Sequence, residues 1–513
     1  MYSIAEKRLS RLIDSGNSGL LTSGLVGVEK ESLRVTADGK LAQSRHPIAL
    51  GSPLTHPYIT TDYSEALAEF ITPPCETIPD VLDFLRDTQR FVYENLGNEF
   101  LWATSMPCVV AEETSIPIAR YGSSNPGLMK TVYRRGLGHR YGRVMQVIAG
   151  VHFNYSFAPD FWPAFQQLEK DSGPLQAFTA DGYFALIRNL QRFGWVVPYL
   201  FGASQAVCKS FLGGAETSLK DFDAETFYEP YATSLRMGDI GYQNNKESGN
   251  GIKVGYDNLD AYVASLTHAI ETPCTEYEKL GVVVNGRHEQ LNANILQIEN
   301  EYYSTIRPKQ IVDAFEKPVH ALKQRGVRYI ELRSIDVNAF EPLGINERQL
   351  RFLEAFLVFS LLHESPVIGA KERDHINHNE IIAAHRGRDP RLELYRGSEK
   401  ILLRDWAKEI INAMAGVCEL LDRDLADKPY STSLAAQRDK AQDADFTPSA
   451  RMLEAMRREG EGFFHFALRM SRQHQDYFGS CDLDPERREM FSRLTEESLA
   501  RQKSMEADND ESF

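Results

Sequence analysis

The sequence predicts an α+β protein that has a largely antiparallel sheet and a mainly helical C-terminal portion. Over the first three-quarters of the chain, segments with apolar residues at every second position alternate with helical patterns. These segments lack the regular strand–helix–strand spacing of a doubly wound fold. From about residue 400, apolar residues instead recur every three or four positions, as in amphipathic helices.

The individual elements follow from these periodicities. Residues 79–97 form an amphipathic pattern that predicts a helix, and two further helical patterns, 401–425 and 449–478, lie in the C-terminal portion. Alternating patterns predict strands at residues 25–35, 145–157, 291–298 and 329–336.

The charged stretch 386–396, which contains Gly387 and Pro390, is the candidate join between two parts of the chain. We expect a catalytic domain at residues 1–395 and a helical portion at residues 396–513. The acidic end of the helical portion predicts a solvated tail.

Composition excludes several classes of function. The chain has 513 residues, 57 Lys+Arg against 72 Asp+Glu and a net charge of −15, so its overall field would repel nucleic acids and anionic membranes. No apolar run approaches the length of a membrane span, and no signal-peptide pattern opens the sequence. The six cysteines form no CxxC pair, so we expect a cytoplasmic protein with reduced thiols. A monomer is the expectation for its oligomeric state.

Two glutamates share one face of the first predicted strand. Glu29 and Glu31 would lie roughly 7 Å apart on that face by strand rise. Such a pair is typical of a solvent-exposed face, and the alternative is that both carboxylates bind a metal ion. The pair alone does not decide between these interpretations.

A second acidic group follows at residues 60–73. Asp62 and Glu65 have the spacing of a helix N-cap, which is a structural role. Glu69 is different, because a carboxylate inside the apolar run 67–71 is usually paired or bound to a metal ion.

Two further predicted strands carry polar side chains on one face. His152 and Asn154 share a face with Gly150, which would let another group approach closely, so this face is either a site wall or the place of a structural histidine. Glu331 and Arg333 also share a face. They form either a surface salt bridge or a metal-binding carboxylate beside a guanidinium that holds a phosphate oxygen.

One basic segment stands out against the acidic background. Residues 114–159 contain no acidic residue, but they contain six basic ones: Arg120, Lys130, Arg134, Arg135, Arg140 and Arg143. The net charge of the chain favours a small anionic ligand over nucleic acid here. The alternative is that these cations only neutralise acidic neighbours in the fold.

If the strands join in one sheet, the acidic residues and His152 would meet in a single cavity. Carboxylates packed this closely cannot all stay ionised without cations. Oxygen ligands with one imidazole favour Mg²⁺, with Mn²⁺ as the other candidate. Divalent ions flanked by arginines are what phosphoryl transfer from a nucleotide requires.

Several motifs occur in a consistent order over roughly the first 360 residues. They are Gly-Val-Glu-Lys-Glu-Ser-Leu-Arg-Val (27–35), Ile-Thr-Thr-Asp-Tyr-Ser-Glu-Ala-Leu-Ala-Glu-Phe-Ile-Thr-Pro (59–73), Ser-Met-Pro-Cys (105–108), Gly-Val-His-Phe-Asn-Tyr-Ser (150–156), Pro-Tyr-Leu-Phe-Gly-Ala-Ser (198–204), Tyr-Ala-Thr-Ser-Leu-Arg-Met (231–237), Leu-Gln-Ile-Glu-Asn-Glu-Tyr-Tyr (296–303) and Tyr-Ile-Glu-Leu-Arg-Ser-Ile-Asp (329–336). Together they resemble the bacterial glutamate–cysteine ligases of the gamma-proteobacterial type. Family members often have Leu-Glu-Arg-Glu at residues 28–31, where this chain has Val-Glu-Lys-Glu and keeps both carboxylates.

This resemblance implies a glutamine-synthetase-like fold, in which antiparallel strands form a cup with helices outside. It implies the first step of glutathione synthesis, in which ATP, L-glutamate and L-cysteine give γ-glutamylcysteine, ADP and phosphate. The implied Mg²⁺ ligands are Glu29, Glu31, Asp62, Glu69, His152 and Glu331. Arg333 would stabilise the transferred phosphoryl group, which makes Arg333 and Glu331 the expected catalytic pair. The residues implied around the cysteine substrate are Tyr133, Tyr242 and Tyr303, with Arg134 and Arg236 near its carboxylate.

Other functions remain open on the residues alone. The same carboxylate activation would serve ligation of glutamate to another amine. The chain could also be an anion- or nucleotide-binding regulator without turnover, or a metal-dependent hydrolase that acts on the nucleotide without an amine.

Overall fold

The computed structural model describes residues 2–108, 113–241, 253–313 and 316–508. Its centre is a seven-stranded sheet with the order β11-β12-β5-β1-β3-β2, in which β4 also pairs with β1, and every pairing is antiparallel. The strands of this sheet are β1 (Leu25–Val35), β2 (Ile59–Thr61), β3 (Leu67–Ile71), β4 (Phe100–Leu101), β5 (Gly150–Ser156), β11 (Ile306–Lys309) and β12 (Tyr329–Asp336).

Smaller sheets and many helices surround this centre. The smaller sheets contain β6 (Ala206–Cys208), β7 (Lys220–Asp221) and β8 (Thr226–Tyr228), then β9 (Val283–Val284) with β10 (Arg287–His288), and β13 (Glu393–Arg396) with β14 (Glu399–Leu402). The helices are α1 (Ser3–Asp14), α2 (Ile78–Asn95), α3 (Asn125–Tyr141), α4 (Phe161–Glu169), α5 (Leu175–Phe193), α6 (Val196–Phe201), α7 (Leu259–Glu271), α8 (Thr275–Leu280), α9 (Pro318–Arg325), α10 (Glu347–Leu362), α11 (Ala370–Arg386), α12 (Leu403–Ala413), α13 (Ala415–Leu421), α14 (Pro429–Gln442), α15 (Pro448–Glu459), α16 (Phe463–Ser480) and α17 (Pro485–Ala507).

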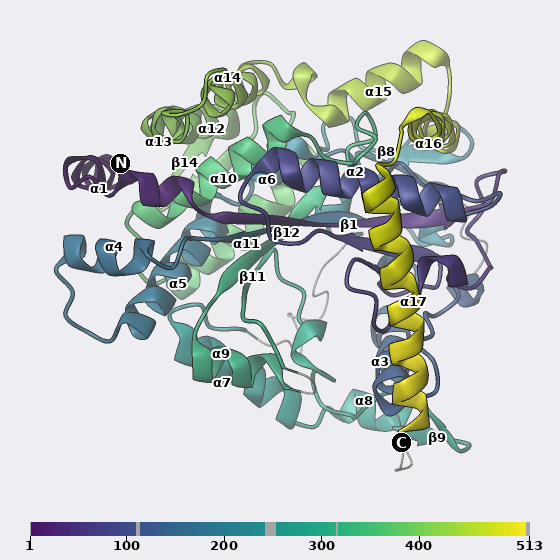
Figure 1. Cartoon of the computed structure of the whole chain (residues 1–513). Helices are drawn as coiled ribbons and strands as arrows, with labels where there is room; N and C mark the ends of the chain where they lie inside the picture. The colour runs from purple at the N-terminus through teal and green to yellow at the C-terminus, as the bar shows by residue number, and fades with distance from the viewer. Residues whose placement is uncertain (1, 109–112, 242–252, 314–315, 509–513) are drawn as a thin grey trace.

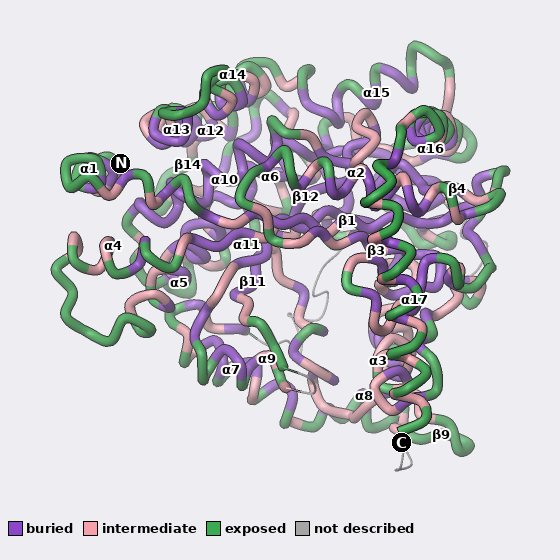
Figure 2. The backbone as a smooth tube through the Cα atoms, viewed as in Figure 1, coloured by how far each residue is buried: buried purple, intermediate pink, exposed green. Residues whose placement is uncertain are grey.

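One face of the sheet is apolar and covered by helices. Val28 on β1, Phe153 on β5 and Leu332 on β12 lie side by side in register, and all three are buried. Helices α2, α6 and α10 pack on these strands, and Figure 1 shows α3, α7, α8 and α9 on the opposite side of the sheet. Figure 2 shows α10 and the central strands as buried. Since side chains alternate along a strand, the neighbours of these apolar residues point to the other face.

Local capping explains where two important helices begin. The Thr77 side chain accepts a hydrogen bond from the Asp80 amide at the start of α2, which covers the apolar face. The Ser124 side chain does the same for the Gly127 amide at the start of α3. In both helices a proline occupies the first turn, where its missing N–H costs nothing.

The α+β class, the antiparallel sheet and the helical C-terminal portion are confirmed. Strands β1 and β12 have the predicted bounds, while β5 begins only at Gly150 because Met145–Val147 forms a 3₁₀ turn. The second C-terminal helical pattern divides into α15 and α16 at Gly460, whose φ is +64°. The predicted division between residues 395 and 396 stays a prediction, and it falls within the β13–β14 hairpin.

The predicted strand at residues 291–298 is wrong. Apart from a single bridge between Asn294 and Pro273, this segment is irregular. Asn292 donates from its side chain to the Gln297 carbonyl, and Asn294 donates to the Ile270 carbonyl. These side chains bond to backbone groups that a strand ladder would otherwise use.

The expectation that all cysteines are free thiols is also wrong, because Cys108 and Cys208 form a disulfide. They are 100 residues apart in sequence, and the fold brings their Cα atoms to 5.5 Å. Sequence spacing carries no information about such a long-range approach. Among the described helices, none is both long and apolar enough to span a membrane.

Candidate active site

Strand register brings the predicted acidic residues together on the polar face of the sheet. Three pairs lie directly opposite each other on adjacent strands: Glu29 with His152, Glu31 with Glu69, and Asn154 with Glu331. The Cβ atoms of directly opposed residues lie about 4.5–5.5 Å apart in antiparallel pairs. Residues that are up to 302 positions apart in sequence therefore share one site.

His152 lies at the centre of this group. Its Nδ1 is 3.0 Å from Glu29 Oε2 and 3.6 Å from Glu331 Oε1, and its Nε2 is 3.7 Å from Glu31 Oε1. Asn154 donates a hydrogen bond of 2.9 Å to the other oxygen of Glu29. Glu31 is buried and the Glu29 side chain is only 15% exposed, so the interpretation of this pair as a solvent-exposed face is wrong. Glu331 is also buried, so its ion pair with Arg333 is not a surface salt bridge.

Three of these residues form a candidate metal centre. Glu29, His152 and Glu331 each offer one ligand atom, and these atoms lie within 4.8 Å of one another. Two carboxylates and one imidazole suit Mg²⁺ or Mn²⁺ better than soft metal ions. The donor set therefore fits the metal that the sequence predicts.

Burial is the largest influence on the pKa values of the carboxylates near β3. Burial, followed by the charges of Glu29, Asp62 and Glu31, raises the pKa of Glu69 well above its usual value. Burial also raises the pKa of Glu31, and the charge of His152 only partly offsets this. A cation bound among these groups would favour their ionised forms.

The opposite side of the cluster is rich in cations. Glu331 Oε1 accepts a hydrogen bond of 2.9 Å from Arg333, and its Oε2 lies 3.4 Å from Lys309 Nζ. Burial alone would raise the pKa of Glu331, but Lys309, Arg333 and His152 outweigh burial and hold that pKa well below its usual range. Glu331 is therefore an ionised carboxylate that orients Arg333.

Asp62 lies in the turn between β2 and β3, so its interpretation as a helix cap is wrong. Its amide instead donates to the Leu67 carbonyl, and its carbonyl accepts hydrogen bonds from Arg134 and from the Tyr121 hydroxyl. The turn holds Asp62 close enough to raise the pKa of Glu69. Arg134 thus joins α3 to the acidic cluster through the backbone carbonyl of Asp62.

Gly150 allows a close approach, as predicted, and the approaching group is Arg236. A Cβ atom at Gly150 would lie 2.1 Å from Arg236 Nη2. Arg236 is 1% exposed, donates a 2.9 Å hydrogen bond to the Arg333 carbonyl and lies 3.7 Å from Asp336. The Gly150 amide also donates to Glu31 at 2.6 Å, so this backbone position supports both Arg333 and the acidic cluster.

Two of the three predicted tyrosines lie within the described residues, and Tyr303 lines a cavity together with Arg333. Tyr303 is buried, and its hydroxyl accepts a 2.5 Å hydrogen bond from the Gln146 side chain. Tyr133 is half-buried on α3, and its carbonyl accepts a 3.2 Å hydrogen bond from Gln297. Tyr242 lies outside the described residues.

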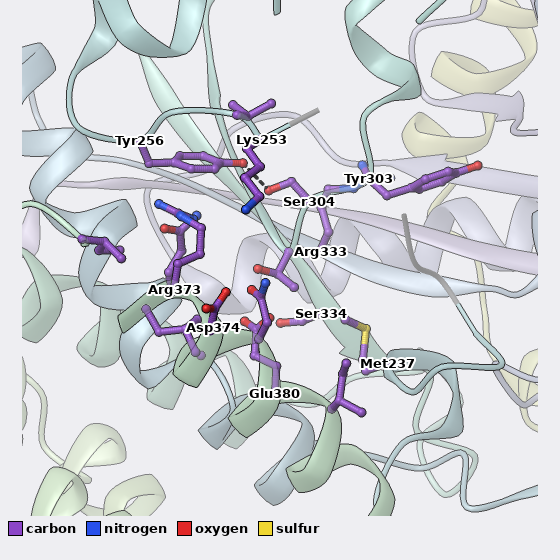
Figure 3. A pocket seen from close by; sticks show the side chains of 18 of the residues that line it. Met237, Lys253, Tyr256, Tyr303, Ser304, Arg333, Ser334, Arg373, Asp374 and Glu380 are labelled. Atoms are coloured by element: carbon purple, nitrogen blue, oxygen red, sulfur yellow. Dashed lines mark hydrogen bonds between the residues drawn. The ribbon is translucent and has the colours of Figure 1, made fainter. Parts of the chain in front are cut away.

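A cavity of about 390 Å³ adjoins the cationic side of the cluster. Arg333 and Tyr303 line it, together with Lys253 and with Arg373 and Glu380 from α11. Figure 3 shows Arg333 between Ser334 and Ser304, with the α11 side chains facing it across the cavity. Sequence reasoning missed the residues of α11, because the helix has few apolar residues and carries no motif.

Lys309 was also missed as a site residue. Arg307 and Lys309 alternate on β11, which pairs with β12 and thereby places Lys309 beside Glu331. The alternation of two cations over Ile306–Lys309 was the available signal. It could not be used, because nothing local indicated which strand lies next to β11.

Comparisons with known proteins show the family of this chain. The family model described as glutamate–cysteine ligase matches residues 9–382. The glutamate–cysteine ligase of Alcanivorax borkumensis is 47% identical over 99% of this chain and 97% of that protein. The glutamate–cysteine ligase of Pseudomonas aeruginosa is 47% identical over 100% of this chain and 97% of that protein.

Solved structures are similar as well. The crystal structure of the glutamate–cysteine ligase of Francisella tularensis in complex with AMP has a TM-score of 0.88 at 36% identity, and the match covers 96% of both chains. A bifunctional glutathione synthetase from Pasteurella multocida, at 23% identity, shares the fold with a TM-score of 0.75 over 94% of this chain and 58% of that one. The predicted cup-like sheet with surrounding helices is thus a known architecture. On the family model and these relatives, the chain belongs to the glutamate–cysteine ligase family.

Proposed function

We propose that this protein joins the γ-carboxylate of L-glutamate to the amino group of L-cysteine at the expense of ATP, the first step of glutathione synthesis. The observation that carries this proposal is the cluster of Glu29, His152 and Glu331 beside Arg333, in a chain of the ligase family. A carboxylate is a poor acyl donor, so a ligase must first convert it into an acyl phosphate. A site with convergent acids and a guanidinium is suited to that phosphoryl transfer.

Mg²⁺ is the proposed metal, with Mn²⁺ as the alternative. The ligands in this proposal are Glu29, Glu31, Asp62, Glu69, His152 and Glu331, which supply carboxylates and one imidazole. When bound, the metal would supply positive charge that offsets the charge of the phosphates and of the glutamate γ-carboxylate. The raised pKa values of Glu31 and Glu69 support this assignment, because the charge of a bound metal would offset the burial and the carboxylate charges that raise them.

Arg333 would act on the transferred phosphoryl group. The glutamate γ-carboxylate attacks the γ-phosphorus of ATP and releases ADP, and the cysteine amine then attacks the acyl carbon and displaces phosphate. The Arg333 guanidinium, held by Glu331 at 2.9 Å, would stabilise negative charge in the first step. The Arg236 side chain would keep Arg333 in place by donating a hydrogen bond to the backbone carbonyl of Arg333.

The nucleotide would occupy the cationic side of the cluster, and the amine would lie between that side and α3. The cavity beside Arg333 has the size of a small-molecule site, and Lys253 and Arg373 add positive charge to it. The Francisella relative was solved with AMP, which supports a nucleotide in this chain. The proposed cysteine site contains Tyr133, Tyr242, Tyr303, Arg134 and Arg236.

The protein would act on small molecules in the cytoplasm as a monomer, with its catalytic domain in residues 1–395. Sedimentation of the purified protein tests the oligomeric state. A dimer whose dissociation reduces activity would contradict this part of the proposal.

An ADP-release assay tests the function. Release should require glutamate, cysteine and Mg²⁺ together, and mass spectrometry should identify γ-glutamylcysteine. ADP release that ignores cysteine would refute the proposal. Comparison with 2-aminobutyrate, ammonia and diamines distinguishes other amine acceptors, while calorimetry distinguishes nucleotide binding without turnover.

A further inference from the structure

Positive charges lie at both ends of the row of acidic residues. Lys309 and Arg333 lie at the β11–β12 end of the sheet, where Arg333 lines the 390 Å³ cavity. At the other end of the sheet, beyond β3 and the Asp62 turn, α3 presents Lys130 and Arg134. The acids between these ends attract cations, so each end is a separate place for an anion.

The α3 end is built on a fixed aromatic ring. The Tyr121 hydroxyl donates to the backbone carbonyls of Thr61, at 2.8 Å, and Asp62, at 3.0 Å. The Arg134 guanidinium lies 4.6 Å from the centre of the Tyr121 ring, and the Lys130 ammonium lies 5.2 Å from it. The two cations are one helical turn apart and share one face of α3.

Lys130 has no anionic partner of its own. Within the described part of the chain, its ammonium makes neither a hydrogen bond nor an ion pair. Burial, then the charge of Arg134, lowers the pKa of Lys130 to about 8, while Glu69 acts in the opposite direction. Two half-buried cations held side by side are unfavourable alone, and an anion bound by both would relieve their repulsion.

We propose that Lys130 binds the α-carboxylate of the amine substrate together with Arg134. This inference rests on the proposed function and adds a residue to it. Arg333 and Lys309 would bind the phosphates at the opposite end, so the reacting γ-carboxylate of glutamate would lie between the two ends. We therefore assign the α3 end, which also carries Tyr133, to the amine substrate. The α-carboxylate of that substrate is the anion that Lys130 and Arg134 would bind.

Cysteamine, which is cysteine without its carboxylate, provides the test. The variant Lys130→Met keeps the apolar stem over Tyr121 and removes the charge. Its kcat/KM for cysteine should fall about 10- to 100-fold, the usual range for one charge-assisted hydrogen bond. Its kcat/KM for cysteamine and its KM for ATP should stay within about twofold of the wild type, because neither involves this carboxylate.

Two further variants control for structure. Lys130→Arg should recover most of the preference for cysteine over cysteamine, and Lys323→Met, an exposed lysine on α9, should behave as the wild type. If Lys130→Met does not fold, Lys130→Gln replaces it. Binding of 2-aminobutyrate, followed by thermal shift with Mg-ADP, should weaken in the Lys130 variant without any turnover.

The outcomes separate this inference from the proposed function. Equal losses for cysteine and cysteamine, or a change confined to the KM of glutamate, would overturn the role of Lys130. An active wild type whose variants keep the full preference for cysteine would do the same. A wild type that releases no ADP with cysteine refutes the proposed function, and unchanged 2-aminobutyrate binding would then refute the role of Lys130 separately.

Discussion

The substitution Gly150→Ala tests whether the space at Gly150 allows Arg236 to hold the backbone of Arg333 in place. The new methyl group would lie 2.1 Å from Nη2 and 2.7 Å from Cζ of Arg236. This is at least about 1 Å closer than an ordinary van der Waals contact. The guanidinium cannot move aside freely, because it is fully buried and bonded to the Arg333 carbonyl.

The size of the effect follows from these contacts. Overpacking of a buried site costs about 1–3 kcal/mol. If Arg236 leaves its place, the buried charge of Asp336 loses its nearest cation, and breaking such a pair costs about 3–5 kcal/mol. We therefore expect a loss of at least about 3 kcal/mol in the free energy of unfolding. Displacement of Arg333 by about 1 Å would reduce kcat about 100-fold.

Gly27→Ala is the matched control. Gly27 lies opposite Asn154 in the same sheet, and a Cβ atom there would meet only ordinary contacts, the nearest at 3.6 Å. Urea denaturation and ADP release should show a large loss for Gly150→Ala and little change for Gly27→Ala. Equal stability and activity in the two variants would refute the argument that Arg236 needs the space at Gly150.

Three further predictions concern charge and metal. Arg333→Ala and Glu331→Gln should each reduce kcat by about 10²–10³, whereas large and equal losses of melting temperature would indicate a structural role instead. Added Mg²⁺ should raise the melting temperature by mass action, and Glu29→Gln should reduce that rise; an equal rise in both proteins would argue against a metal at Glu29. Burial lowers the pKa of Lys30, whose ammonium donates to Gln89, to about 7. Above pH 7 the folded protein therefore binds fewer protons than the unfolded chain. The free energy of unfolding of the wild type should therefore rise, relative to that of Lys30→Met, by about 1.4 kcal/mol per pH unit up to about pH 10. A difference that does not depend on pH in urea titrations would contradict this assignment.

Much of the sheet could be predicted because strand alternation is a local property. The bounds of β1 and β12, and the shared face of Glu29 and Glu31, follow from residues at every second position. The segment 291–298 shows the limit of this signal, because asparagine side chains there bond to nearby backbone. A pattern of residue types does not reveal that competition.

The sequence by itself determined which chemical groups are present and which of them share a strand face. Only the tertiary structure decided that Glu331 lies beside His152 and that Arg236 fills the space at Gly150. It also decided that Lys130 and Arg134 both contact the ring of Tyr121. The physical reason is that some of these properties depend on neighbouring residues and others on contacts between distant parts of the chain. Side-chain direction depends on φ and ψ of single residues, whereas strand order, register and packing minimise the free energy of the whole chain and join groups far apart along it.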